Sequence, residues 1–220
     1  MIHEKKLATE KSVFFNGRKY EQNKLGLWLP QKELSEYKKI LLVGNSGGGK
    51  STTADYVGKV SDHRVIHTDL VRFSSGLIPV PDAISEKIIN DFLKVNPKAV
   101  IDFYGDNHAL LKRFSEYADL ILFFNFGIDG SFRGFQSKME NHAKGRPPLG
   151  IAFDPNYASE GTVNTWRLLQ TAQEKMIPEW QKIFKQSGAD VIELSNFRDV
   201  DKFKQEFALS CTKQDYARMI

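Results

Sequence analysis

The chain has 220 residues and a mass of 25.1 kDa, with 41% apolar and 26% charged residues, which suits one globular domain with an appendage and excludes a disordered or fibrous chain. A single cysteine excludes an internal disulfide framework, and no apolar stretch approaches the roughly 20 residues of a membrane span. The net charge of +4 arises within residues 1–39, which hold nine Lys and Arg against five Asp and Glu. The rest of the chain therefore lacks the basic surplus of a nucleic-acid-binding protein.

The first 38 residues are expected to form an N-terminal extension. The start, MIHEKKLATEK, lacks the apolar core of a secretory signal, so we expect a cytoplasmic protein that makes no use of a membrane. Asn16-Gly17 lies between two short strand-like runs and suits a type I′ turn, which predicts a β-hairpin. Such an extension could add a strand to the edge of a sheet or serve as a dimerisation arm.

From Lys39 onward, short apolar runs alternate with amphipathic segments. The expected strands are Ile40–Val43, Arg64–Thr68, Ala99–Ile101, Leu120–Phe126 and Val191–Leu194. Helical patterns lie near residues 50–60, 82–95, 107–117, 131–143, 164–187 and 199–209, and Pro178 should kink or split the fifth. This alternation predicts an α/β fold, a three-layer sandwich with a mainly parallel five-stranded sheet. We expect the domain to span residues 39–210, followed by a tail over 211–220.

The segment after the first strand of this domain reads G-x-x-x-x-G-K-S and leads into a helical pattern. Glycines let backbone amides surround phosphates, Lys50 can reach the β/γ oxygens, and the Ser51 hydroxyl can bind Mg²⁺. This is a Walker A sequence, and it predicts binding of a nucleoside triphosphate, which we expect to be ATP. The residues expected to bind it are Gly44, Asn45, Ser46, Gly47, Gly48, Gly49, Lys50, Ser51 and Thr52.

In parallel sheets, ligands bind beyond the carboxyl ends of the strands. Asp69 follows the second strand, where it could activate an acceptor hydroxyl, and Arg72 could hold an anionic acceptor. Alternatively, Asp69 caps a helical turn and Arg72 forms a surface ion pair. The third strand ends in Asp102, which fits a Walker B carboxylate that holds Mg²⁺ together with Ser51.

A basic segment over residues 131–148 follows the fourth strand and predicts a lid. Arg133 and Arg146 are its best candidates for stabilising the transferred phosphoryl group, because planar guanidinium groups match phosphate. Alternatively, these cations form the wet face of a helix. After the fifth strand, Ser195-Asn196 could contact the nucleotide base.

Asp102–Gly105 also reads D-x-x-G, which keeps a nucleotide-dependent switch such as a GTPase as the alternative function. However, the guanine-selecting N-K-x-D sequence does not follow the fourth strand. About 30 residues with a helical pattern separate the second and third strands, which favours a parallel βαβ crossover over the antiparallel hairpin of Ras-like GTPases.

Taken in order, GNSGGGKST, DLVR, VID and the basic segment resemble P-loop kinases of the group that contains adenylate kinases and topology-modulation proteins. Asp69-x-x-Arg72 is similar to the D-x-x-R of polynucleotide 5′-hydroxyl kinases and zeta-toxin-like kinases, which implies an Asp base and an Arg that binds substrate. The resemblance implies a P-loop NTPase fold and transfer of a phosphoryl group from ATP, with Mg²⁺. The implied acceptor is a small molecule or nucleotide, with a nucleic-acid 5′ end less favoured. Phe103-Tyr104 departs from the Gly-Phe-Pro-Arg of adenylate kinases, which puts a nucleoside-monophosphate acceptor in doubt.

Overall fold

The computed structural model describes residues 12–15, 17–74, 78–144 and 166–219. The central strands are β4 (Lys39–Gly44), β5 (Arg64–His67), β8 (Ala99–Phe103), β9 (Leu120–Phe124) and β10 (Asp190–Leu194). The longer helices are α1 (Lys50–Val60), α3 (Asp82–Val95), α4 (His108–Tyr117), α5 (Gly127–Ala143), α7 (Ile177–Ser187) and α8 (Phe197–Met219). Within these ranges, no helix combines the length and apolar character needed to span a bilayer.

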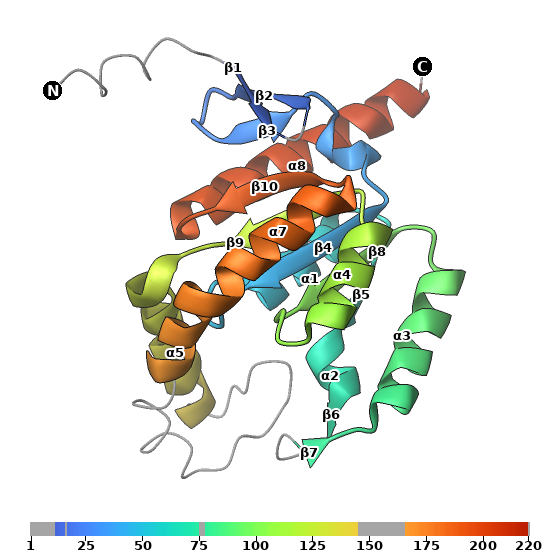
Figure 1. Ribbon diagram of the computed structural model, residues 1–220. Coiled ribbons are helices and arrows are strands. Elements are labelled where there is room, and N and C mark those ends of the chain that lie inside the picture. Colours follow the sequence, from blue (N-terminus) through green and yellow to red (C-terminus); the bar gives the residue numbers. More distant parts are fainter. Residues whose placement is uncertain (1–11, 16, 75–77, 145–165, 220) are drawn as a thin grey trace, which may run out of the picture.

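The five central strands form one parallel sheet in the order β10-β9-β4-β8-β5. β5 and β8 are neighbours and run parallel, and α3 lies in the connection between them. The expected crossover is therefore present, and the antiparallel hairpin of a Ras-like GTPase is not. This sheet, with helices on both faces (Figure 1), confirms the predicted α/β class and the P-loop NTPase fold.

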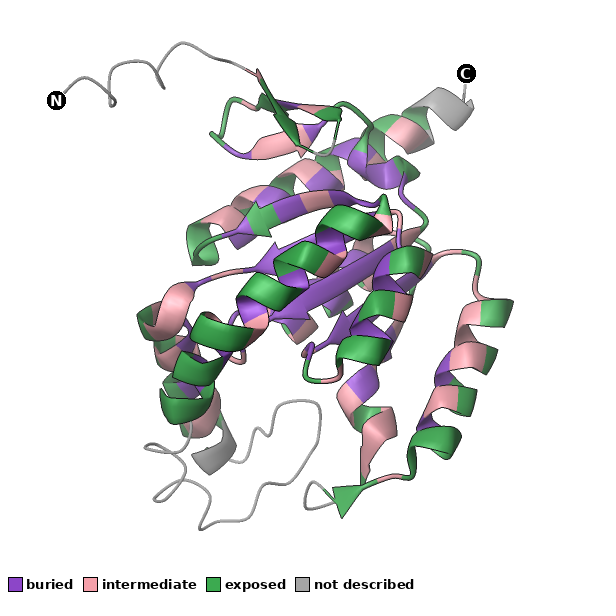
Figure 2. Ribbon diagram, viewed as in Figure 1, coloured by how far each residue is buried: buried purple, intermediate pink, exposed green. Residues whose placement is uncertain are grey.

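Alternating side chains of β4 belong to the two hydrophobic cores of the sandwich, as the twofold period of a strand requires. Ile40 and Leu42 belong to the core that α1 and α8 cover, and Leu41 and Val43 belong to the core that α4 and α7 cover. The middle strands β4, β8 and β9 are accordingly buried along almost their whole length, whereas the outer strands β5 and β10 are partly exposed (Figure 2). β4 is thus paired on both sides and packed on both faces, and it positions the loop that follows its carboxyl end.

The N-terminal extension forms its own antiparallel sheet of β1 (Ser12–Phe15), β2 (Arg18–Gln22) and β3 (Trp28–Pro30). In the described residues it does not add a strand to the central sheet, so that alternative was wrong. It is attached to the start of β10 through Asp190, which pairs with Arg18 at 2.8 Å and accepts a 2.5 Å hydrogen bond from the Tyr37 hydroxyl. η1 (Leu34–Glu36) then leads the chain into β4.

Two helices add detail to the sequence pattern. The helical pattern around Pro178 is interrupted as expected, because the turn before it, η4 (Ala172–Met176), is π-helical and α7 begins at Ile177, which places Pro178 in a first turn where a missing backbone N–H is tolerated. α8 continues to Met219, ten residues beyond the apolar repeat, and so takes in most of the expected tail. Its later part is held by Ser210, whose hydroxyl accepts a hydrogen bond from the Ser35 amide of η1.

Candidate active site

The loop between β4 and α1 has the backbone of a phosphate-binding loop. Gly47 and Gly49 have left-handed φ angles of +84° and +83°, and a Cβ on Gly44 would lie 2.3 Å from the carbonyl oxygen of Phe124. Gly49 is the N-cap of α1, and no side chain caps this end of the helix. The first amide groups of α1 are therefore not taken by a side-chain cap, which suits an anionic ligand.

Other residues of the loop also fit a polar ligand. Asn45 is fully buried, and neither polar atom of its side chain has a hydrogen-bond partner among the described residues. Buried polar groups are rarely left unpaired, so the loop retains an unmet need for a polar partner. Ser46 and Ser51 are half-buried, and Thr52 is exposed on the first turn of α1.

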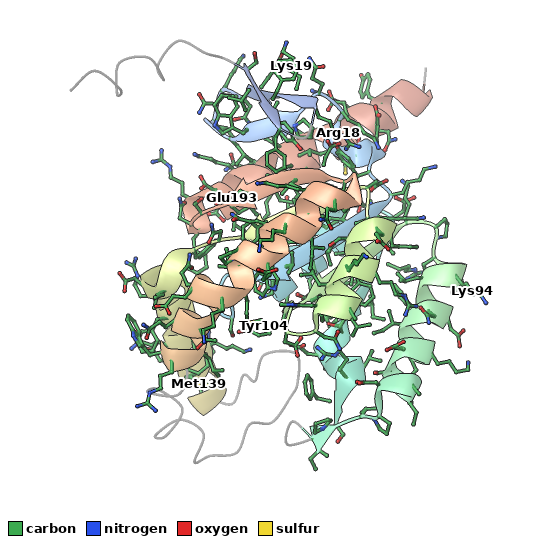
Figure 3. The ribbon with its side chains drawn as sticks, in the orientation of Figure 1. Arg18, Lys19, Lys94, Tyr104, Met139 and Glu193 are labelled. Atoms are coloured by element: carbon green, nitrogen blue, oxygen red, sulfur yellow. The ribbon has the colours of Figure 1, made fainter. Side chains whose placement is uncertain are left out.

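Lys50 turns back onto its own loop, where its Nζ donates a 2.9 Å hydrogen bond to the carbonyl oxygen of Asn45. Its side chain lies beside the ring of Tyr104, with Nζ 5.7 Å from the ring centroid. Figure 3 labels Tyr104, which directly follows β8 at the carboxyl end of the sheet. Burial lowers the pKa of Lys50 from 10.5 to about 8, against the opposing attraction of Asp102 and Asp69.

Asp69 lies in α2 (Thr68–Arg72), a short helix that follows β5 directly. It is in the first turn, whereas the N-cap position is occupied by His67, so the alternative of Asp69 as the cap was wrong. Burial and the negative charge of Asp102 raise the pKa of Asp69, although Lys50 opposes the shift. A carboxylate with a raised pKa is a stronger proton acceptor than an ordinary aspartate.

Asp102 is 6% exposed and accepts a hydrogen bond from a histidine that the sequence did not single out. His67 Nδ1 lies 2.8 Å from Asp102 Oδ2, and His67 Nε2 lies 2.9 Å from Asp55 Oδ1. Burial opposes the charged ring, but the hydrogen bonds and charges of the two carboxylates outweigh it and raise the pKa of His67. The pairing depends on strand register, which aligns His67 with Asp102, and the sequence alone does not specify that register.

Arg72 is held by Asp106 in a bidentate ion pair, with distances of 2.7 and 3.0 Å. Its guanidinium also lies over the rings of Phe73 and Phe103, 5.4 Å from each centroid. Arg72 thus makes the ion pair that we gave as the alternative to substrate binding. The pair fixes a guanidinium next to α2, where an anionic acceptor would have to compete with Asp106.

The part of the basic segment that lies within the described residues belongs mainly to helix α5, which touches the phosphate-binding loop. The contact is between backbones, because a Cβ on Gly134 would lie 1.9 Å from the carbonyl oxygen of Gly47. Arg133 is exposed, and Arg146 is outside the described residues. Lys138 of α5 interacts with the acids: burial lowers its pKa, and the charges of Asp69 and Asp102 oppose that shift. The sequence pattern had indicated the segment, with Lys138 among its cations, but favoured Arg133 and Arg146.

An aromatic residue at the start of α8 also lies against the loop. Phe197 Cε1 is 3.7 Å from the position of a Cβ on Gly49, and its ring stacks edge-on against Phe126 at 4.8 Å. Phe197 is 47% exposed. This surface adjoins Ser195-Asn196, which the sequence had suggested as a contact for the nucleotide base.

The donor groups at this edge fit a triphosphate and its metal ion. The uncapped start of α1 and Lys50 offer donors to phosphate oxygens, and the Ser51 hydroxyl and the Asp102 carboxylate are oxygen ligands of the type that Mg²⁺ prefers. In P-loop enzymes these two kinds of group lie on the helix after the loop and on a neighbouring strand. That is the arrangement of α1 and β8.

Comparisons with known proteins support the fold. No protein-family model matches the sequence, and no curated protein matches it. Among solved structures, shikimate kinase from Acinetobacter baumannii in complex with shikimate is similar with a TM-score of 0.51 and 15% identity, over 84% of this chain and 98% of that chain. Shikimate kinase from Bacteroides thetaiotaomicron has a TM-score of 0.41 at 16% identity, over 84% and 99% of the two chains. A gluconokinase from Sinorhizobium meliloti 1021 has a TM-score of 0.43 at 13% identity, over 80% and 92%.

Of these three, the first alone is close enough to support an argument, and at this identity the argument concerns the fold. The parallel sheet, the Gly44–Ser51 loop and the acids at the carboxyl ends of β5 and β8 together define a P-loop NTPase fold of the kind found in small kinases.

Proposed function

We propose that this protein is an ATP-dependent, Mg²⁺-requiring phosphotransferase that moves the γ-phosphoryl group to a hydroxyl or phosphate group of a small molecule. The observation that carries the proposal is the shared environment of Lys50, Asp69 and Asp102. These groups come from three different elements, yet each affects the pKa of another. Phosphoryl transfer needs a group that binds the phosphates of the donor and a group that activates the acceptor. Lys50 and Asp69 supply these two groups at the same edge of the sheet.

The donor half binds the triphosphate. Loop amides and the Lys50 ammonium hold the β- and γ-phosphates, and Lys50 exchanges its bond to Asn45 for phosphate oxygens. Ser51 and Asp102 would hold Mg²⁺, which neutralises charge on the phosphate oxygens when bound. The exposed face of Phe197 beside Gly49 is suited to stack on the nucleotide base.

The acceptor half activates the nucleophile. For a hydroxyl acceptor, its oxygen forms the new bond to the γ-phosphorus, its proton passes to the Asp69 carboxylate, and the bond to the β-phosphate oxygen breaks to release ADP. The raised pKa of Asp69 favours this proton transfer. A phosphate acceptor that is already ionised needs no such transfer, so dependence on Asp69 distinguishes the two acceptor types.

Cations around the acceptor half stabilise the transferred group. Lys138 is the candidate from α5, because its charge is felt at Asp69 and Lys50. The Arg72 guanidinium is held by the Asp106 carboxylate. An acidic acceptor that displaces Asp106 would bind the same guanidinium through its own carboxylate, and Arg72 would thereby orient it. Roles for Arg133 and Arg146 require that the basic segment rearrange over the site, and they stay predictions.

The test is a transfer screen with γ-labelled ATP. Acceptors include nucleosides, nucleoside monophosphates, 5′-hydroxyl oligonucleotides, nucleotide sugars and small alcohols. The neighbour in complex with shikimate adds hydroxylated carboxylic acids to this set. We expect ATP to be preferred over GTP and one acceptor class to stimulate turnover.

Two lysines on the same helix supply a matched control. Lys50→Ala should abolish transfer, whereas Lys59→Ala, at an exposed position in the last turn of α1, should retain it. Transfer that survives Lys50→Ala would contradict the proposal. GTP selectivity with slow hydrolysis and no acceptor would instead support a nucleotide-dependent switch.

A further inference from the structure

Three side chains form a continuous hydrogen-bonded chain from helix α1 to the end of β8. Asp55 Oδ1, the two ring nitrogens of His67 and Asp102 Oδ2 are linked at 2.9 and 2.8 Å. The exposed fraction falls along this chain, from 61% for the Asp55 side chain to 12% for His67 and 7% for Asp102. A solvent-facing carboxylate is thus connected to a buried one through an imidazole.

The hydrogen bonds from Asp55 through His67 restrict the rotation of the Asp102 carboxylate. His67 binds Oδ2, which fixes the rotation of the carboxylate and so the direction of Oδ1. The backbone is fixed independently, because the Thr68 hydroxyl donates a 2.8 Å hydrogen bond to the Asp102 carbonyl oxygen. A carboxylate oriented in this way has lost the rotational freedom that it would otherwise lose on binding a cation.

The same hydrogen bonds also connect Asp102 to helix α1, which carries Ser51. Ser51 and Asp55 are four residues apart on α1 and therefore share one face of the helix. The His67 bridge thus joins β8 and α1 at the place where each contributes an oxygen ligand. The bridge ends on Asp55, about one helical turn after Ser51 on α1.

We propose that His67 is a positioning residue for the divalent cation that accompanies the nucleotide, holding the Asp102 carboxylate in line with Ser51 by way of Asp55. The inference rests on the proposed binding of Mg²⁺-nucleotide at this loop. It does not depend on which acceptor is used, or on whether phosphoryl transfer occurs.

Two substitutions of His67 separate its two hydrogen bonds. An asparagine amide nitrogen can take the place of Nδ1, so His67→Asn can keep the bond to Asp102. A glutamine amide nitrogen can take the place of Nε2, so His67→Gln can keep the bond to Asp55 and lose the bond to Asp102. Both replacements are neutral amides, so a general loss of stability would affect them alike.

The measurement is the affinity for an ATP analogue with a β,γ-imido bridge, by calorimetry over a series of Mg²⁺ concentrations. Loss of an outer partner of a metal ligand typically costs about 10- to 100-fold in metal affinity. We expect His67→Gln to raise the half-saturating Mg²⁺ concentration at least about tenfold, while affinity for the analogue without Mg²⁺ is unchanged. His67→Asn should stay within about threefold of wild type, because the bond to Asp102 is kept.

The role of Asp55 is tested by a double-mutant cycle. Asp55→Ala should raise the half-saturating Mg²⁺ concentration by less than His67→Gln does, and should add nothing in the His67→Gln background, since no bond then leads to Asp102. Equal effects of His67→Asn and His67→Gln, or a wild-type Mg²⁺ dependence in Asp102→Asn, would overturn the proposal. Normal Mg²⁺-dependent binding with no transfer to any acceptor would instead refute the proposed function and leave this inference standing.

Discussion

Replacing Lys50 with methionine should make the protein more stable, although it removes the residue most needed for triphosphate binding. Lys50 is buried, and burial holds its pKa at about 8 in the folded chain, against 10.5 as the ordinary value. The folded state therefore bears a cost for keeping this side chain charged at neutral pH. Methionine has a similar length and carries no charge, so Lys50→Met removes the cost.

The size of the effect follows from the two pKa values. A difference from 10.5 to about 8 corresponds to about 3 kcal/mol at about 1.4 kcal/mol per pKa unit. Loss of the hydrogen bond from Nζ to the Asn45 carbonyl oxygen offsets about 1 kcal/mol of this gain. The net expectation is a stabilisation of about 2 kcal/mol at pH 7, or about 4 to 8 °C in melting temperature for a chain of this size.

The pH dependence gives the sharper test. Below pH 8, Lys50 is charged in both the folded and the unfolded chain, so the cost is present in full. Between pH 8 and 10.5 the folded chain releases the proton first and the cost falls, and above 10.5 it is gone. The stability difference between Lys50→Met and wild type should therefore be constant up to about pH 8 and shrink above it.

Urea unfolding from pH 6 to pH 10 measures this difference, with the exposed Lys59→Met as the matched control. The control should remain within about 0.5 kcal/mol of wild type throughout. Mg²⁺-ATP should stabilise the wild type and the control but not Lys50→Met. A variant that is less stable than wild type at pH 7, or a difference that does not shrink above pH 8, would refute the reasoning.

Three further predictions concern neighbouring parts of the site. Asp69→Asn should retain ATP binding and lose about 10²- to 10⁴-fold in kcat with a hydroxyl acceptor, and unchanged turnover would remove Asp69 from the mechanism. Because the charge of Asp106 helps to raise the pKa of Asp69, Asp106→Asn should move the acidic limb of the pH–rate profile to lower pH, and a shift to higher pH would argue against Asp69 as the base. Gly134→Ala places a Cβ 1.9 Å from the Gly47 carbonyl oxygen and should lower stability by about 1–3 kcal/mol in thermal unfolding. Gly130→Ala meets no atom nearer than 3.1 Å and should cost less, so equal losses would contradict the close contact of α5 with the loop.

Features of the fold that depend on local pattern could be predicted from the sequence. The strands are short apolar runs bounded by polar residues, and the glycine-rich loop stands where such a run meets a helical pattern, so β4 and α1 were found at nearly their observed bounds. The length of α8 could not be found in this way. Residues beyond Leu209 fall outside the apolar repeat, and the helix is held there partly by a side-chain hydrogen bond between Ser210 and η1, more than 170 residues away in sequence.

In the candidate site, too, some residues could be predicted from the local sequence pattern and others depend on contacts between distant parts of the chain. Asp69 and Asp102 could be predicted as acids at strand ends, because parallel strands bring their carboxyl ends to one edge. His67 could not, since its role depends on the register of β5 against β8. The sequence could not decide between Lys138 and Arg133. They are five residues apart and so point to different faces of a helix, and the pattern does not show which face meets the site. The rotation of α5, set by the contact of Gly134 with the loop, decides which cation faces the acids.

Two lysines of the site, the buried Lys50 and the half-buried Lys138, explain why this edge of the sheet is suited to an anion. Burial lowers the pKa of both Lys50 and Lys138, so each is costly to keep charged in the free protein. Asp69 and Asp102 reduce that cost but do not cancel it. An oligophosphate brought against the same two lysines supplies the missing negative charge, so the energy that destabilises the free protein is recovered on binding. Charged groups that are unfavourably buried in the free protein, and are compensated only when a ligand binds, are typical of binding and catalytic sites.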